Sequence, residues 1–275
     1  MSMLRERVLV VVVLLPLGLG LIYLGGLAFV ALVAFLLGVA AWEYANLSAA
    51  LGRGPARPLL VLAAVGFPLA RLEWGTTLDS ALLTFFTLLA VAWHLVDYER
   101  GATESGTDFA LTLSGGVYIG YLGAYFVTLR QAPQGMWWLL LALPTIWIAD
   151  SGAYFVGRTM GRHPLAPRLS PKKTWEGYLA GVVTGVLGAV VLAAAWNALA
   201  GPIPGMSAAH AALMGLVIAV LAPLGDLAES MFKRQAGQKD SGRLFPGHGG
   251  AFDRIDSWLW AAPLAYGLLV LWQLV

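Results

Sequence analysis

Long hydrophobic runs alternate with short polar segments along most of the chain. A helix needs roughly 17–25 apolar residues to cross a bilayer. Nine runs reach or approach that length: 8–24, 27–43, 58–71, 81–97, 110–129, 136–153, 178–199, 210–227 and 257–275. The pattern therefore predicts an all-α, polytopic integral membrane protein with about nine transmembrane helices.

The positions of the basic residues predict how these helices are oriented. Loops on the cytoplasmic side of a membrane are enriched in Lys and Arg. If the N-terminus is cytoplasmic, nine spans place 15 of the 17 Lys and Arg residues on cytoplasmic loops, leaving only Arg71 and Arg130 outside. We therefore expect a cytoplasmic N-terminus.

Composition supports lipid as the solvent of most side chains. Of the 275 residues, 59% are hydrophobic and 12% are charged, whereas soluble domains carry about 25% charged residues. The net charge of +2 gives no reason to expect a nucleic-acid partner. Because the chain has no cysteine, disulfides, thiolate nucleophiles and cysteine-bound metals are excluded.

The two halves of the chain differ in their polar content. Residues 1–135 are almost entirely apolar helices, for which we expect a role in packing and lipid access. The polar residues that stand out there, Glu43 and His94, are interpreted as interfacial or helix-packing residues. Residues 136–275 hold the ordered polar segments and form the predicted catalytic part. We treat both parts as one integral domain.

The first polar segment spans 150–177. Asp150 ends an apolar stretch, where a carboxylate is costly unless it is paired or binds a cation. Ser170-Pro171 is typical of a helix start, with Ser as N-cap and Pro at the first helical position. That start would place three polar residues in the first turn, where free N–H groups bind anions: Lys172, Lys173 and Thr174. The alternative is a solvated basic loop followed by a capped helix.

The second polar segment spans 225–257. If the helix of 210–227 continues to Arg234, five polar residues share one of its faces: Asp226, Glu229, Ser230, Lys233 and Arg234. That face offers carboxylates to a divalent cation and ammonium and guanidinium groups to a phosphate. A Gly- and Pro-rich loop follows at 245–250, and Asp253 and Asp256 then share a face of the next helix. The alternative is a patch of ion pairs on a loop between two spans.

Together these residue types favour phosphoryl or nucleotidyl transfer at the membrane surface. Carboxylates can hold divalent cations that bridge the attacking and leaving oxygens, and basic residues neutralise developing charge. The sequence lacks a G-x-x-x-x-G-K-[ST] loop, a G-x-S-x-G elbow and an H-E-x-x-H motif. We expect the two segments to form two walls of one site.

The second segment resembles the signature of the phosphatidate cytidylyltransferases, or CDP-diacylglycerol synthases. The matching elements are Ser230, Lys233-Arg234, Lys239-Asp240, His248-Gly249-Gly250 and Asp253-Arg254-x-Asp256. Two further blocks are similar to parts of that family: Asp150-Ser-Gly-Ala-Tyr-x-x-Gly-Arg158 and Ser170-Pro-Lys-Lys-Thr-x-Glu-Gly177. The detailed resemblance covers about 150–257.

The resemblance implies a reaction and its partners. Membrane-bound phosphatidic acid would attack the α-phosphorus of CTP, giving CDP-diacylglycerol and pyrophosphate in phospholipid biosynthesis. The expected partners are CTP, phosphatidic acid and membrane lipid, and the family suggests a homodimer. The expected cofactor is Mg²⁺, as two divalent ions or as Mg²⁺ with a monovalent cation. The site would face the cytoplasm from the inner membrane of a bacterium.

The resemblance also implies roles for individual residues. Asp226 and Asp253 are the favoured metal ligands, with Asp150, Glu229 and Asp256 as second-rank candidates. The implied catalytic residues are Asp226, Asp253, Lys233, Arg234, Lys239, Asp240 and His248. The implied substrate-binding residues are Ser170, Lys172, Lys173, Thr174, Ser230, Arg254, Asp150 and Tyr154.

Two other functions stay open from the residues alone. In an ion-coupled transporter or channel, Asp150 and Asp226 would be ion-pathway residues. A CTP-dependent lipid kinase would use similar groups but release CDP instead of pyrophosphate. The Asp-Gly-x-x-Ala-Arg block of the CDP-alcohol phosphotransferases is absent from the sequence.

Overall fold

The computed structural model describes residues 2–245 and 249–275, with side chains from residue 12 onward. Helices predominate, which confirms the all-α prediction. Within this described part, six helical segments are long and apolar enough to cross a membrane: Gly26–Ala50, Asp79–Glu99, Ser105–Gln131, Gly135–Met160, Trp175–Ala200 and Ala208–Gln235. The count of nine spans and the cytoplasmic N-terminus stay predictions.

The chain divides into two compact units. The first unit contains Met1–Thr128 and Phe232–Ile255, and the second contains Leu129–Met231 and Asp256–Val275. The borders fall inside helices α6 (Tyr125–Gln131) and α10 (Pro223–Gln235) and directly after α11 (Phe252–Ile255). Residues 232–255 thus pack with the N-terminal helices. The predicted functional division after residue 135 stays a prediction.

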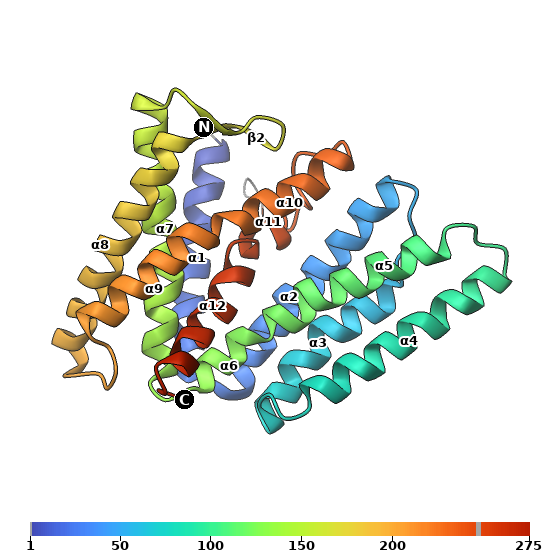
Figure 1. Ribbon diagram of the computed structural model, residues 1–275, viewed down its shortest axis with the longest axis horizontal. Coiled ribbons are helices and arrows are strands. Elements are labelled where there is room, and N and C mark those ends of the chain that lie inside the picture. The colour runs from blue at the N-terminus through green and yellow to red at the C-terminus, as the bar shows by residue number, and fades with distance from the viewer. Residues whose placement is uncertain (1, 246–248) are drawn as a thin grey trace. The chain divides into compact units, whose positions relative to one another are not determined.

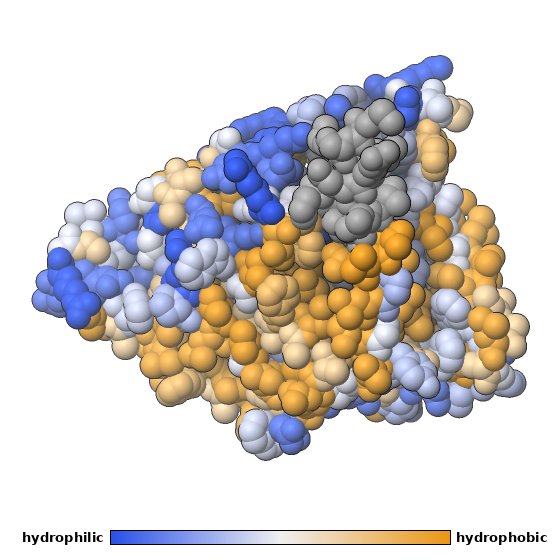
Figure 2. All heavy atoms as spheres, turned by 180° about the vertical axis from the view of Figure 1, so that it is seen from behind, coloured by the Kyte–Doolittle hydropathy of each residue, from blue (hydrophilic) through white to orange (hydrophobic). Residues whose placement is uncertain are grey.

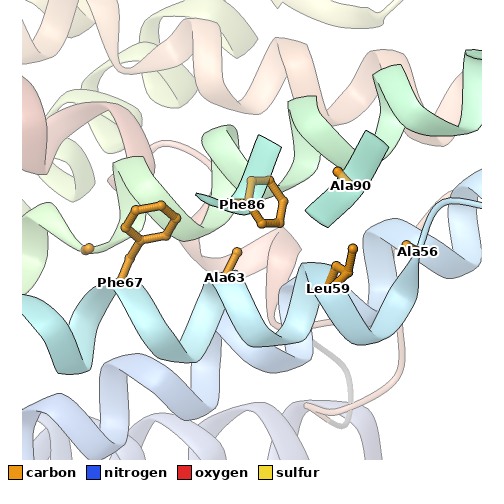
Figure 3. Close-up of a cluster of buried hydrophobic side chains, with 7 residues drawn as sticks. Ala56, Leu59, Ala63, Phe67, Phe86 and Ala90 are labelled. Atoms are coloured by element: carbon orange, nitrogen blue, oxygen red, sulfur yellow. The ribbon is translucent and has the colours of Figure 1, made fainter. Parts of the chain in front are cut away.

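Successive helices form the N-terminal part of the first unit, and the second to the fifth of them pack against one another (Figure 1). They are α1 (Ser2–Leu24), α2 (Gly26–Ala50), α3 (Arg57–Trp74), α4 (Asp79–Glu99), α5 (Ser105–Gly115) and the π-helical η1 (Gly116–Tyr121). A core cluster joins α3 to α4 and to Ala124 (Figure 3). Its other members are Ala56 directly before α3, Leu59, Ala63 and Phe67 on α3, and Phe86 and Ala90 on α4.

The predicted run at 110–129 is helical but not uniform. It consists of α5, η1 and the first residues of α6. A Cβ atom on Gly116 would overlap the ring of Phe86, and one on Gly120 would lie 2.9 Å from the Ala63 backbone. Glycines at these positions therefore allow the π-helical turn to pack directly against α3 and α4.

The second unit is built around three packed helices and a short hairpin (Figure 1). Its elements are α7 (Gly135–Met160), β1 (Pro164–Ala166), β2 (Ser170–Thr174), α8 (Trp175–Ala200), α9 (Ala208–Leu221) and α12 (Trp258–Leu271). Helix α7 packs against α8 and α9, and α12 packs against α7 and α9.

Helix α8 has two stripes of opposite character. Small residues at every fourth position are buried, namely Gly177, Gly181, Gly185, Ala189 and Ala193. The opposite stripe carries Leu179, Val183, Leu187 and Val191, each between 58% and 67% exposed. A helix that buries its smallest residues and exposes its largest apolar ones is typical of lipid surroundings. Hydrophobic side chains also cover much of the face shown in Figure 2.

One predicted helix start is wrong. Residues Ser170–Thr174 form strand β2, which pairs antiparallel with β1, and helix α8 begins only at Trp175. Thr174 is its N-cap, because its side chain accepts a hydrogen bond from the Gly177 amide at 3.2 Å. Pro171 is tolerated because this hairpin has two strands and hence only edges. Pairing with β1 draws these residues into a strand and moves the helix start to Trp175.

The predicted extension of the helix at 210–227 is confirmed with one interruption. Helix α9 ends at Leu221, and α10 continues from Pro223 to Gln235 after the single residue Ala222. The expectation that Asp253 and Asp256 share a helix is wrong, since α11 ends at Ile255. The two aspartates therefore make separate contacts.

Candidate functional site

A cavity of about 670 Å³ opens in the second unit between α7, the hairpin, α8, α9 and α10. Part of its wall is apolar, formed by residues such as Leu165 and Ala219. Its polar lining consists of Asp150, Tyr154, Arg158, Lys172, Lys173, Thr174, Tyr178 and Asp226. Residues from both predicted segments thus meet at one cavity. Its size is typical of a small-ligand pocket.

The hairpin that carries the cavity lysines is tied to α8 at its base. Trp175 donates its amide to the His163 carbonyl at 2.9 Å. The Glu176 carboxylate accepts the amides of Arg162 at 3.1 Å and His163 at 3.2 Å, and the His163 Nδ1 atom lies 2.6 Å from Glu176 Oε1. These contacts hold Lys172 and Lys173 next to the start of α8.

Lys173 and Asp226 form an ion pair within the cavity lining. Both side chains are partly exposed, at 29% and 36%. Ser230, one turn further along α10, donates its hydroxyl to Asp226 Oδ1 at 3.4 Å. Because water reaches both groups, the ammonium can bind an anionic ligand in place of Asp226, and the carboxylate can bind a cation in place of Lys173.

Three carboxylates of the second unit, which we call the acidic cluster, converge beside this pair. One oxygen each of Asp226, Glu229 and Asp256 lies within 4.8 Å of the others. The close approach depends on Gly225, since a Cβ atom there would overlap the Asp256 carbonyl. Carboxylate oxygens are the ligands that Mg²⁺ prefers in proteins. The donor set therefore fits a divalent cation.

The first unit contains a different set of carboxylate contacts, centred on Asp253. Its Oδ1 accepts the Lys233 ammonium at 2.6 Å, and its Oδ2 accepts the Ser241 amide, the Ser241 hydroxyl and the Gly250 amide at 2.8–2.9 Å. The side chains of Asp253 and Lys233 are only 6% and 11% exposed. Burial alone would raise the pKa of Asp253, but the Lys233 ammonium and the two backbone amides hold it below its usual value.

Glu43 of α2 completes this set, which we call the loop carboxylates (Glu43 and Asp253). Its Oε1 accepts the Ala251 amide at 3.1 Å, and its Oε2 accepts the Phe252 amide and the Ser241 hydroxyl, both at 2.9 Å. The sequence interpretation missed this contact, because roughly 200 residues separate Glu43 from its partners. The sequence signal was a glutamate inside an apolar run, which is costly unless it is satisfied. His94 matches its expected packing role: it is buried, 2.8 Å from Thr112 Oγ1.

The remaining predicted residues lie in varied surroundings. Ser170 is half-buried at the start of β2. Four residues are exposed, namely Arg234, Lys239, Asp240 and Arg254. His248 lies outside the described residues. The structure groups Asp226 with Glu229 and Asp256, whereas the favoured pairing of Asp226 with Asp253 joins residues of two units and stays a prediction.

The chain is similar to known proteins over nearly its whole length. The family model described as "Cytidylyltransferase family" matches residues 5–272. A phosphatidate cytidylyltransferase of Synechocystis sp. is 34% identical over 299 residues, covering 97% of this chain and 96% of its own. One from Bacillus subtilis is 39% identical over 193 residues, covering 70% and 68%. One from Brucella suis is 34% identical over 273 residues, covering 97% and 93%.

Proposed function

The chain belongs to the cytidylyltransferase family, and on that premise we propose that it transfers the cytidylyl group of CTP to phosphatidic acid. The products are CDP-diacylglycerol and pyrophosphate. The observation that carries the proposal is the cavity of the second unit, whose lining combines Lys172, Lys173 and Asp226 with apolar side chains. Such a lining suits a phosphate attached to a lipid.

The cavity residues have a direct role in binding. The Lys172 and Lys173 ammonium groups attract the phosphates of CTP or of phosphatidic acid, and Tyr154 and Arg158 extend the polar surface along α7. A phosphate bound by Lys173 competes with the Asp226 carboxylate. Binding of the anionic substrate therefore leaves Asp226 available to a cation.

The acidic cluster is the proposed Mg²⁺ site, with Asp226, Glu229 and Asp256 as ligands. A bound divalent cation would neutralise charge on the phosphate oxygens during transfer. Asp253 and Asp150 stay further candidates for a second divalent ion or a monovalent one. The four donors on Asp253 would first have to give way.

The reaction needs positioning rather than a strong base. The phosphate of phosphatidic acid is ionised at neutral pH, so one of its oxygens can attack without losing a proton to the protein. A bond forms between that oxygen and the α-phosphorus of CTP, and the bond from the α-phosphorus to the bridging oxygen breaks. Pyrophosphate leaves with that electron pair. The basic residues hold both anions against their mutual repulsion.

The location follows from the substrates. Phosphatidic acid stays in the bilayer, whereas CTP arrives from the cytoplasm, so we place the site at the cytoplasmic face of a bacterial inner membrane. Nine spans with a cytoplasmic N-terminus, a homodimer, and a packing and lipid-access role for 1–135 belong to the same proposal. The exposed Arg234, Lys239, Asp240 and Arg254 would meet CTP from the aqueous side.

Product analysis tests the function. Purified protein in detergent receives CTP, phosphatidic acid and Mg²⁺, and we expect pyrophosphate and CDP-diacylglycerol in equal amounts. Release of CDP with a phosphorylated lipid would identify a lipid kinase instead. Absence of turnover with Mg²⁺ or Mn²⁺, together with ion flux into proteoliposomes, would support the transporter.

A further inference from the structure

Glu43 is buried within an apolar helix, yet it contacts the loop between α10 and α11. Only 5% of the residue is exposed. Its carboxylate accepts three hydrogen bonds, from the Ser241 hydroxyl and from the amides of Ala251 and Phe252. A carboxylate in such surroundings is costly to bury unless donors satisfy it. The loop supplies these donors.

Two glycines show that the loop is built around this carboxylate. A Cβ atom on Gly242 or on Gly250 would overlap the Glu43 carboxylate. Next to Glu43, Tyr44 packs edge-on against Phe232 and Phe252, with ring centroids 5.3 and 6.4 Å apart. The loop is therefore fixed to α2 at both of its ends.

Ser241 connects Glu43 to Asp253. Its hydroxyl lies 2.9 Å from Glu43 Oε2 and 2.9 Å from Asp253 Oδ2. A hydroxyl has one hydrogen to donate, so the two carboxylates compete for it. The Asp253 amide in turn donates to Ser241 Oγ at 3.3 Å. A change at Glu43 thus reaches Asp253 through a single atom, and from there its ion-pair partner Lys233.

We propose that Glu43 is a positioning residue for cytidylyl transfer. It acts through Ser241 and the first amides of α11 to set the orientation of Asp253 and Lys233. The inference rests on the proposed function in one respect, namely that Asp253 and Lys233 take part in the reaction. The contacts that carry it lie entirely within the first unit.

The first test is Glu43→Gln in the full-length protein. A glutamine has the same shape but only one acceptor oxygen, so its NH₂ group must face a donor of the loop. We expect kcat/KM to fall at least about tenfold, with a raised KM for CTP, because a shift of about 1 Å in a catalytic group has large effects. The matched control is Glu99→Gln, an exposed glutamate on α4 of the same unit, which should behave as wild type.

Kinetic constants distinguish mispositioned catalytic groups from a smaller fraction of folded, active enzyme. If Glu43 only stabilises the fold, Glu43→Gln will lower kcat and the unfolding temperature while KM stays within twofold of wild type, and that result would overturn the proposal. Activity within twofold in all parameters would overturn it too. Glu43→Asp, which keeps the charge, should recover part of the lost kcat/KM.

Ser241→Ala covers the case in which Glu43→Gln does not fold. It removes the hydroxyl shared by Glu43 and Asp253, while the Ala251 and Phe252 amides still donate to Glu43. We expect the same rise in KM. In the double variant, kcat/KM should fall by less than the product of the two separate fold-changes. A wild-type KM in Ser241→Ala would contradict the proposed route.

Hydrogen–deuterium exchange separates this inference from the proposed function. In Glu43→Gln, the amides of Ser241, Gly250 and Ala251 should exchange at least about tenfold faster, because their bonds depend directly or indirectly on Glu43. If the wild type makes no CDP-diacylglycerol, the proposed function fails, and exchange still decides whether Glu43 holds the loop. Unchanged exchange would refute the positioning role even in an active enzyme.

Discussion

The acidic cluster and the loop carboxylates use the same chemical group in two opposite ways. Glu43 and Asp253 are buried, and each accepts at least three hydrogen bonds from the protein itself. Asp226, Glu229 and Asp256 instead bring carboxylate oxygens within 4.8 Å of one another, and Asp226 pairs with a partly exposed lysine. The first arrangement is satisfied internally. The second concentrates negative charge.

The difference shows what a carboxylate needs in order to act on a ligand. Repulsion between close carboxylates is relieved by a cation, so the acidic cluster favours a bound metal. A carboxylate that is already satisfied by donors of the protein gains less from a metal and more from fixing the loop that supplies these donors. On the proposed function, the acidic cluster is therefore the favoured metal site, Glu43 organises the loop, and Asp253 is the carboxylate that this loop positions.

The largest effect should come from Asp226→Asn. The substitution removes a charge from the acidic cluster and the ion-pair partner of Lys173, so we expect activity to fall at least about 100-fold. Binding of Mn²⁺, followed by electron paramagnetic resonance, should weaken in parallel. The exposed Glu99→Gln variant serves as control. Full Mn²⁺ binding in Asp226→Asn would remove this residue from the metal site.

Asp253→Asn should be costly in stability as well as in activity. It removes the negative charge from the buried ion pair with Lys233, which lowers the free energy of unfolding. We expect a lower unfolding temperature in detergent together with a large loss of turnover. The double variant Asp253→Leu with Lys233→Met should regain neither stability nor activity, because the Ser241 and Gly250 amides lose their acceptor. A stable, fully active Asp253→Asn would break the contrast between the two sets.

Lys173→Met should affect substrate binding more than stability. Its ion pair with Asp226 is partly exposed, so removing it changes the unfolding free energy by about 1 kcal/mol or less. The lost ammonium should raise the KM for an anionic substrate about tenfold. Steady-state kinetics, with the concentrations of CTP and phosphatidic acid varied in turn, would identify the substrate whose KM is raised. An unchanged KM for both would exclude Lys173 from substrate binding.

The smallest effect should come from Thr174→Ala at the start of α8. Loss of the N-cap bond to the Gly177 amide costs about 1 kcal/mol of stability. Activity should fall only slightly, because the hairpin is also held through Glu176. Thr174→Ser keeps the capping oxygen and should match the wild type in thermal unfolding. Equal unfolding temperatures for the two variants would argue against this cap.

The site could be predicted from sequence where its residues are close along the chain. Asp226, Glu229 and Ser230 follow helical spacing, so placing them on α10 required only the period of the helix. The start of α8 was predicted too early, because Ser170-Pro171 is a strong local signal for a helix start, whereas pairing with β1 makes these residues a strand. Helical spacing was therefore sufficient for the residues of α10, whereas strand pairing overrode the local signal at Ser170-Pro171.

The sequence by itself determined the solvent, the helical class and the kind of chemistry, since each depends on composition or on short spacings. Its long apolar runs need lipid, and its motif blocks carry the resemblance to the cytidylyltransferases. Only the tertiary structure decided which carboxylates work together. Asp253 and Asp256 are three residues apart but make different contacts, and Glu43 reaches Ser241 across 198 positions. Such pairings depend on helix packing and on glycines that allow close approach, which no local pattern specifies.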